Sequence, residues 1–236
     1  MFQPADFFDV STVEVGRPLD DFATVWEIIA RMPEIVDDLL GGKRIIKGSV
    51  APTAVIDDGP VYIAESAVVE PGVYLKGPAY IGPAVTLRHG AYVREACVFL
   101  ANSLLGHASE AKNSLLLPDA KAPHFAYVGD SILGRRVNLG AGTKLSNLPI
   151  TGARGPDGRR PVIVISANGE QVDTGLSKLG AILGDDVQVG CNAVLNPGVV
   201  VGPRALIYPN ITLRKGFYQG EQLYKLRQTI DIDQRR

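Results

Sequence analysis

The chain has 236 residues, of which 46% are hydrophobic and 21% charged, and its formal net charge is −1. This is the composition of a folded globular protein, and without a lysine–arginine block it favours neither nucleic acid nor an anionic membrane as a partner. No signal-peptide pattern opens the chain and no apolar run is long enough to span a bilayer. We therefore expect a cytoplasmic protein with no membrane segment, whose two cysteines are free thiols.

The first predicted element is a helical region within residues 1–42. From residue 18 on, apolar residues recur at helical spacing. Asp20 or Asp21 can cap the start, and Pro33 can open a second short helix that ends at Gly41. This region is interpreted either as a docking helix or as a cap that forms a lid over the first coil of the domain that follows.

A six-residue hydrophobic repeat occupies residues 43–216. From Ile63 to Leu117 every sixth residue is aliphatic or aromatic, with one alanine, and the repeat returns after a slip over 133–145 and over 183–213. A period of six fits neither an α-helix nor two-residue alternation. It predicts a hexapeptide β-helix, a triangular prism of parallel strands with three sides, and hence three repeats, to a coil. Residues about 18 apart then stack about 4.8 Å apart on neighbouring coils.

Two segments depart from the repeat. Residues 149–178 predict an inserted arm, because two β-rich runs flank Asn168 and Gly169, a dipeptide typical of a hairpin turn. Residues 217–236 are polar and carry both charges, and they predict a solvated tail.

The period also predicts which polar side chains stack. Arg94 and Lys112 are separated by one full coil of three repeats, so two cations share one column. They repel each other unless an anion such as a phosphate bridges them. In the alternative interpretation both point into water with Glu95 and Glu110 as counter-ions.

The three histidines raise a second question. His89 and His107 are also one full coil apart, so they predict either exposed corner residues or half of a zinc site. His124 is expected off that column, and on a different side of the prism from Lys112, which precedes it by only two repeats. With this spacing His124 meets the cations only across an interface between two prisms, or through the irregularity in the repeat that follows it.

The segments "KAPHFAYVGDS" and "NLGAGT" carry a resemblance. The chain resembles the hexapeptide-repeat acyltransferases, which fold as a left-handed parallel β-helix. Within them it is similar to the acetyltransferase half of the bifunctional sugar-1-phosphate nucleotidylyltransferase/glucosamine-1-phosphate acetyltransferases of archaeal type. The resemblance implies a homotrimer with active sites between neighbouring prisms. It also implies transfer from acetyl-CoA to an amino-sugar phosphate, in nucleotide-sugar metabolism leading to UDP-GlcNAc, with no metal required.

The resemblance also implies roles for particular residues, carried over by position. His124 matches the catalytic base, and Ala141, Cys191 and Pro209 fall where the family lines its acetyl-CoA groove. An imidazole can take the proton of an amine near neutral pH, and N–H groups of the "GAG" corner can stabilise an oxyanion. The positions that match sugar or phosphate contacts are Arg94, Lys112, Tyr127, Asn138, Asn147 and Lys178.

The chain departs from the family pattern at three of its positions. Leu148 stands where a tyrosine is expected, and Cys191 and Pro209 stand where small residues are usual. No phosphate-loop motif of a nucleotidylyltransferase precedes residue 43, and residues 16–30 are similar to the helix that closes such a domain. An alternative function is therefore a non-catalytic trimerising or regulatory module.

Overall fold

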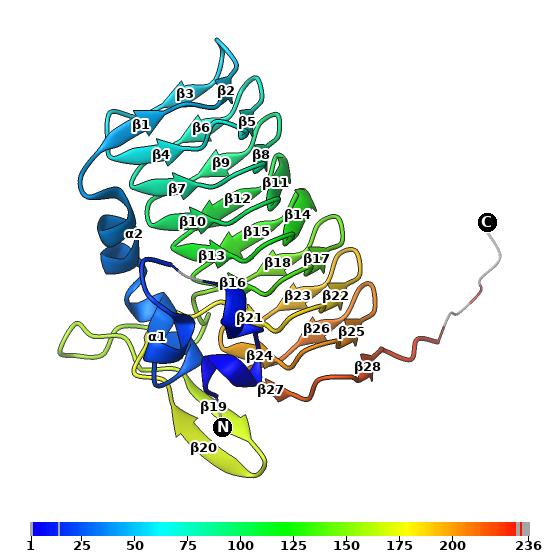
Figure 1. The fold of residues 1–236 in the computed structure, drawn as a ribbon. Helices are drawn as coiled ribbons and strands as arrows, with labels where there is room; N and C mark the ends of the chain where they lie inside the picture. Colours follow the sequence, from blue (N-terminus) through cyan, green and yellow to red (C-terminus); the bar gives the residue numbers. More distant parts are fainter. Residues whose placement is uncertain (1, 14, 230–231, 233–236) are drawn as a thin grey trace.

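The computed structural model describes residues 2–13, 15–229 and 232. Over these residues the chain winds into a solenoid whose three parallel sheets form the flanks of a triangular prism (Figure 1). The predicted fold class, a parallel β-helix of hexapeptide repeats, is confirmed.

We number the flanks in the order in which the chain visits them. Flank 1 contains β1 (Arg44–Ile46), β4 (Val61–Ile63), β7 (Ala79–Ile81), β10 (Cys97–Phe99), β13 (Ser114–Leu116), β16 (Ile132–Leu133), β21 (Ala181–Leu183), β24 (Val199–Val201) and β27 (Gly216–Tyr218). Flank 2 contains β2 (Ser49–Val50), β5 (Val68–Val69), β8 (Thr86–Leu87), β11 (Leu104–His107), β14 (Lys121–His124), β17 (Asn138–Leu139), β22 (Gln188–Val189), β25 (Leu206–Ile207) and β28 (Leu223–Tyr224). Flank 3 contains β3 (Val55–Ile56), β6 (Tyr74–Leu75), β9 (Tyr92–Val93), β12 (Glu110–Lys112), β15 (Tyr127–Gly129), β18 (Lys144–Leu145), β23 (Val194–Leu195) and β26 (Thr212–Leu213).

The six-residue repeat fills the inside of the prism. Ile63, Leu75, Leu87 and Phe99 are fully buried in one continuous core. Left-handed backbone at the corners lets each short strand turn into the next flank, as at Asn102, where φ is 60°. The aliphatic stack and these corners together explain why period six folds as a β-helix.

The coils do not all contain three full repeats. The predicted offset holds between β7 and β10, where Ala79 pairs with Cys97, but Cys97 then pairs with Ser114, so the next coil is shorter by one residue. The core position on β13 is accordingly Leu116, and Leu117 lies in the second core against the N-terminal segment. The slip read from the sequence therefore begins one repeat earlier than expected, between Ala111 and Leu116.

The helical region forms as predicted but begins differently. It comprises 3-10 turns at Pro4–Asp6, Val10–Thr12 and Leu19–Asp21, followed by α1 (Val25–Ala30) and α2 (Met32–Leu40). Asp20 and Asp21 lie in a 3-10 turn and cap neither helix, because Thr24 stands at the cap position of α1. Gly41 ends α2 in a left-handed conformation, as expected.

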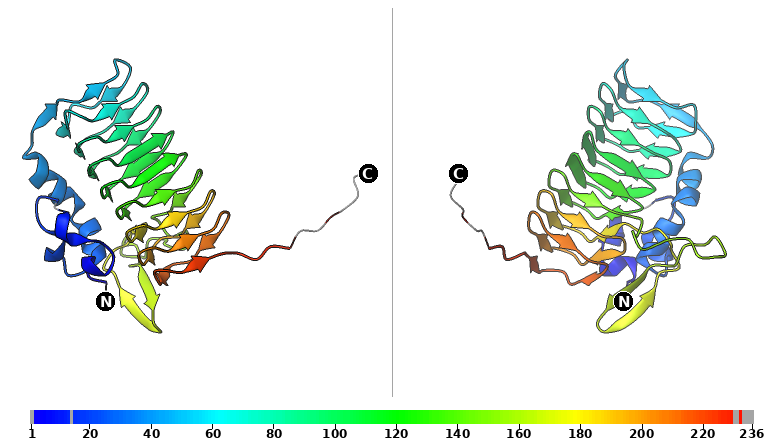
Figure 2. Two further views of the ribbon diagram at one scale, coloured as in Figure 1. Left: turned by 45° about the vertical axis from the view of Figure 1, so that its right-hand side comes forward. Right: turned by 180° about the vertical axis from the view of Figure 1, so that it is seen from behind.

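The helices do not form a lid over the first coil. They lie along the outer face of flank 1 (Figures 1 and 2), where Ile28 and Met32 share a buried cluster with outward-facing Val98, Leu115 and Ile132. The outward residues of flank 1 are apolar, so this flank needs a cover along its length. The N-terminal segment supplies that cover and leaves flanks 2 and 3 open.

Asp185 clips the N-terminal segment to the prism. Its buried carboxylate accepts hydrogen bonds from the backbone N–H groups of Asp9, at 2.8 Å, and Arg135, at 2.7 Å. Burial is the main influence on this carboxyl group and raises its pKa above the ordinary value, against the lowering effect of the two N–H donors.

We expect Asp185→Ala to lower the free energy of unfolding by about 1–3 kcal/mol, because both N–H groups lose their acceptor in a partly buried place. Urea denaturation measures the loss. Asp186→Ala is the matched control, since Asp186 forms an exposed ion pair with Arg136 and such pairs contribute at most about 1 kcal/mol. Equal losses in the two variants would contradict the role of Asp185 in holding the N-terminal segment to the prism.

The arm is a hairpin, as predicted. β19 (Val164–Ala167) and β20 (Glu170–Asp173) pair antiparallel, and φ is positive at Asn168 and Gly169. The coils on either side pair across the insertion, Ile132 with Ile182, so residues 149–178 leave the prism and return to it. The solenoid also continues past residue 216 as β27 and β28, so the predicted tail begins too early.

Candidate functional site

Six of the candidate or stacked residues lie in one column where flank 2 turns into flank 3. We call this column the histidine corner. The residue that follows each member of the column donates its backbone N–H to the carbonyl oxygen of the member one coil earlier. Gly142 donates in this way to His124 at 3.0 Å, and Asn192 donates to Ala141 at 2.8 Å. The column members, from the N-terminal side, are His89, His107, His124, Ala141, Cys191 and Pro209.

His124 therefore lies in the column of the other two histidines, and the expectation that it lies off that column is wrong. The reason is the shortened coil, which aligns His107 with His124. His89 and His107 stack with ring centroids 5.6 Å apart, as their spacing predicts. Among the described residues no group of three or more histidine, cysteine, aspartate or glutamate side chains is placed to hold a metal ion.

The three histidines differ in what holds their rings. Nδ1 of His89 lies 2.7 Å from the carbonyl oxygen of Pro71, and Nδ1 of His107 lies 3.1 Å from that of His89. The His124 side chain is exposed and forms no hydrogen bond with any other described residue. Each of these contacts occupies Nδ1 and leaves Nε2 of the ring open, whereas in His124 both ring nitrogens are without a partner among the described residues.

Close backbone packing positions His124. A Cβ atom on Gly106 would lie 1.7 Å from the carbonyl oxygen of Pro123, so β11 can approach β14 at this level only with glycine at 106. Phe125, 55% exposed, follows His124 at the corner and packs edge-on against His107 at 5.1 Å. These contacts fix the backbone that carries His124.

The predicted acetyl-CoA positions extend the column below His124. Ala141 is half-buried, and Cys191 and Pro209 are exposed. Gly140 and Gly142 already donate their N–H groups, to Val189 and His124, which leaves Ala141 as the "GAG" residue whose N–H has no acceptor among the described residues. Cys97 differs from the exposed Cys191 because it is fully buried, and this burial raises the pKa of its thiol to about 12.

The cations lie at the opposite end of the flank 3 strands. We call this place, where flank 3 turns into flank 1, the cation corner, formed by Arg94, Lys112, Asp130 and Asn147. Arg94 and Lys112 stack as predicted, since Arg94 donates its N–H to Ala111 at 2.8 Å. Nη1 of Arg94 lies 3.1 Å from Glu110, and its Nε lies 4.0 Å from Glu95. Glu110 and Glu95 are thus counter-ions in this chain, as the alternative interpretation has it.

A buried carboxylate organises this corner, and the sequence reading missed it. Asp130 is 5% exposed, and its two oxygens accept hydrogen bonds from Nδ2 of Asn113, at 2.8 Å, and Nδ2 of Asn147. Oδ1 of Asn147 in turn accepts from the hydroxyl of Tyr127 at 3.3 Å. Burial raises the pKa of that hydroxyl, so it remains a donor. Both Asn113 and Asp130 have positive φ. The sequence signal that could have predicted their contact is their separation by one shortened coil.

Two further candidates lie outside these corners. Lys178 ends the arm next to the cation corner, since the following residue, Leu179, donates its N–H to the carbonyl of Asn147 at 3.1 Å. Asn138 lies on flank 2, where it pairs with Lys121. The structure therefore brings Arg94, Lys112, Tyr127, Asn147 and Lys178 to one end of flank 3. It places His124, Ala141, Cys191 and Pro209 at the other end, with Asn138 on the adjoining flank.

The three parallel sheets define a hexapeptide-repeat β-helix, and comparison with known proteins gives its relatives. The chain is 34% identical over 209 residues to the bifunctional sugar-1-phosphate nucleotidylyltransferase/acetyltransferase of Sulfurisphaera tokodaii, which covers 89% of this chain and 48% of the relative. It is 38% identical over 213 residues to the bifunctional protein GlmU of Methanococcus maripaludis, covering 90% and 49%. The chain is thus a homologue of these proteins, as its motifs predict, and spans about half their length.

Two other comparisons complete the findings. No family model matches the chain. The UDP-N-acetylglucosamine acyltransferase of Campylobacter jejuni is 16% identical, with a TM-score of 0.42 over 72% of this chain and 68% of that one. Within the described residues, no helix has both the length and the apolar character needed to cross a membrane.

Proposed function

We propose that this chain transfers the acetyl group of acetyl-CoA to the amine of an amino-sugar phosphate such as glucosamine-1-phosphate. The observation that carries the proposal is the position of His124. Its imidazole is exposed and unpaired among the described side chains, and it stands directly above the predicted acetyl-CoA column. The relatives are named as acetyltransferases, which supports the reaction type.

In this proposal His124 is the general base. The amine nitrogen attacks the thioester carbon, and His124 takes the proton that the nitrogen loses. The C–S bond then breaks, and the imidazolium returns the proton to the departing CoA thiolate. The N–H of Ala141, which has no acceptor among the described residues, is a candidate donor to the oxyanion. Below it, Cys191 and Pro209 would line the groove for the cofactor.

The substrate would be held by the cation corner. Arg94 and Lys112 supply charge for the phosphate, with Lys178 beside them, and a phosphate would compete with Glu110 for Arg94. Tyr127 and Asn147 offer a linked donor and acceptor to the sugar hydroxyls, and Asp130 fixes the orientation of the Asn147 amide. Orientation of the amine is the contribution expected of these groups.

A homotrimer would bring the two corners together. In one prism His124 and the cation corner lie at opposite ends of the flank 3 strands. Flank 1 is covered by the N-terminal segment, so flanks 2 and 3 are the ones left open to neighbours. A threefold arrangement that buries them can set the His124 of one subunit, with Asn138 on flank 2, against the cation corner of the next.

The experiment is a direct assay of CoA release. Purified protein with acetyl-CoA and glucosamine-1-phosphate should release free CoA thiol, and galactosamine-1-phosphate tests the sugar. Glucosamine without phosphate is the matched control and should react at least about tenfold more slowly, since one lost charged contact costs roughly 1.5–3 kcal/mol. No release with any amino-sugar phosphate, and no binding of either substrate by calorimetry, would favour a non-catalytic module.

A further inference from the structure

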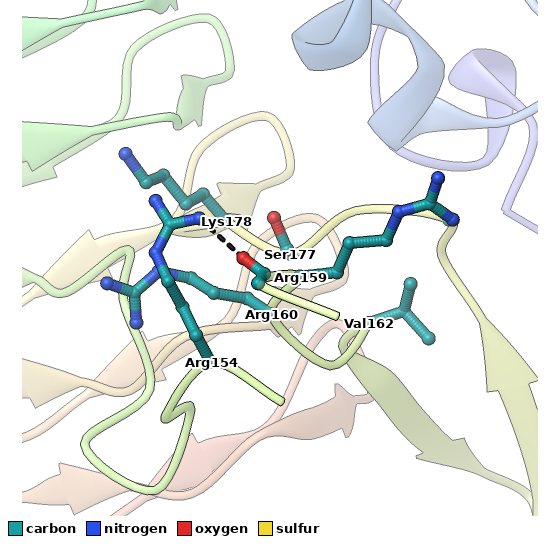
Figure 3. A pocket seen from close by; sticks show the side chains of 8 residues that line it. Arg154, Arg159, Arg160, Val162, Ser177 and Lys178 are labelled. Carbon is teal, nitrogen blue, oxygen red and sulfur yellow. Dashed lines mark hydrogen bonds between the residues drawn. The ribbon is translucent and has the colours of Figure 1, made fainter. Parts of the chain in front are cut away.

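The arm contains a hollow whose charged lining is entirely cationic. Its volume is about 400 Å³, within the range of small-molecule sites, and its wall is formed by Arg154, Gly158, Arg159, Arg160, Val162, Gly175, Ser177 and Lys178 (Figure 3). The side chains of Arg154, Arg160 and Lys178 converge on one side of the hollow, and Arg159 points the opposite way.

These cations have no counter-ion in the part of the chain that the structure describes. Within residues 2–13, 15–229 and 232, neither the three arginines nor Lys178 forms an ion pair. Asp157 and Asp173 lie on the same arm, where they accept from the N–H groups of Arg159, at 3.0 Å, and Gly175, at 2.8 Å, but neither forms an ion pair with a cation of the hollow. Like charges converge here, and an anion from solution would relieve their repulsion.

The loop holds the two converging arginines in place. Nη1 of Arg154 donates to the carbonyl of Gly158 at 2.6 Å, and Nη1 of Arg160 donates to that of Gly152 at 2.5 Å. A guanidinium has five N–H donors in a fixed fork, so both arginines keep most of theirs free. Such forks match phosphate oxygens two at a time.

The hollow adjoins the predicted sugar site. Lys178 belongs to its wall, and the next residue, Leu179, is bonded to Asn147 of the cation corner. A ligand whose sugar lies at the cation corner could therefore extend into the hollow of the arm.

We infer that the arm binds the phosphate of a nucleotide, so that the acceptor is an amino sugar linked to a nucleoside diphosphate. The inference rests on the proposed function for the sugar end of the ligand. One phosphate lies against Arg94 and Lys112, where Glu95 and Glu110 already balance part of the charge. The second phosphate enters the arm, where Arg154 and Arg160 are uncompensated.

Calorimetric titration with uridine diphosphate and, separately, guanosine diphosphate tests the site. In Arg154→Ala and in Arg160→Ala the dissociation constant should rise at least about tenfold, the equivalent of 1.4 kcal/mol. Arg159→Ala is the matched control, with the same change of charge on the same loop, and should bind as the unchanged protein does. Because all three side chains are on the exposed loop, melting temperatures should stay alike.

Titration with adenosine 3′,5′-bisphosphate separates the nucleotide end of CoA from the nucleotide of a sugar substrate. Its affinity should be the same in all three variants. The inference is overturned if neither diphosphate binds, if the three variants lose affinity equally, or if the bisphosphate is the ligand that Arg154→Ala and Arg160→Ala lose. Calorimetry needs no turnover, so a protein that binds the diphosphate but releases no CoA would contradict the proposed function and not this site.

Discussion

Replacing His124 with alanine should lower kcat for acetyl transfer by about 10²–10⁴-fold, the usual contribution of a general base. KM for both substrates should change little, because the imidazole forms no hydrogen bond within the described chain and its removal leaves the corner packing intact.

His89→Ala is the control for this variant. His89 belongs to the same column, but Nδ1 of its ring faces the carbonyl of Pro71 and it lies two coils away from His124. Its loss should leave kcat within about twofold, as expected for an exposed residue outside the site. A His124→Ala enzyme that keeps its kcat as a folded trimer would remove His124 from the reaction.

Replacing Gly106 with alanine should destabilise the fold by about 3 kcal/mol or more, at the upper end for overpacked cores. The added methyl group would lie 1.7 Å from the carbonyl oxygen of Pro123, which belongs to the backbone of β14 and cannot turn away. Relief requires the strand that carries His124 to shift. Urea denaturation should therefore show a lower midpoint, and the soluble fraction should have reduced kcat.

Gly59→Ala is the matched control for this variant. Its nearest neighbours would lie 3.7 Å from the added methyl group, an ordinary contact. That variant should keep its stability within about 0.5 kcal/mol. If the two glycine variants lose the same free energy of unfolding, the close contact between β11 and β14 is not what makes Gly106→Ala destabilising.

The interior of the prism could be predicted from the sequence because most inward positions are filled by apolar residues six apart. The outward positions could not be predicted as far along the chain. One residue is missing between Ala111 and Leu116, and this moves His124 into the column of His107. A strict count of six cannot locate the change, because Leu115, Leu116 and Leu117 are all leucines and Leu117 fits the inward position by residue type as well as Leu116 does.

The position of the N-terminal helices on the prism could not be predicted from the sequence either. Their apolar spacing predicts that they cover something, but the surface they cover is flank 1, whose outward Val98, Leu115 and Ile132 lie at non-repeat positions. Asp130 was missed for a related reason, because its burial depends on Asn113 and Asn147 from neighbouring coils. The resemblance to relatives identified the candidate residues. The fold places most of them at two separate corners of the prism, with Asn138 on flank 2.

The measurement that tests the account most directly is complementation between two inactive variants. His124→Ala is mixed with an Arg94→Ala/Lys112→Ala double variant under conditions that exchange subunits. If each site takes its histidine from one subunit and its cations from the next, about a quarter of the sites in randomly mixed trimers are intact, and activity returns. Mixed trimers, verified by native mass spectrometry, that stay inactive would contradict a site shared between subunits.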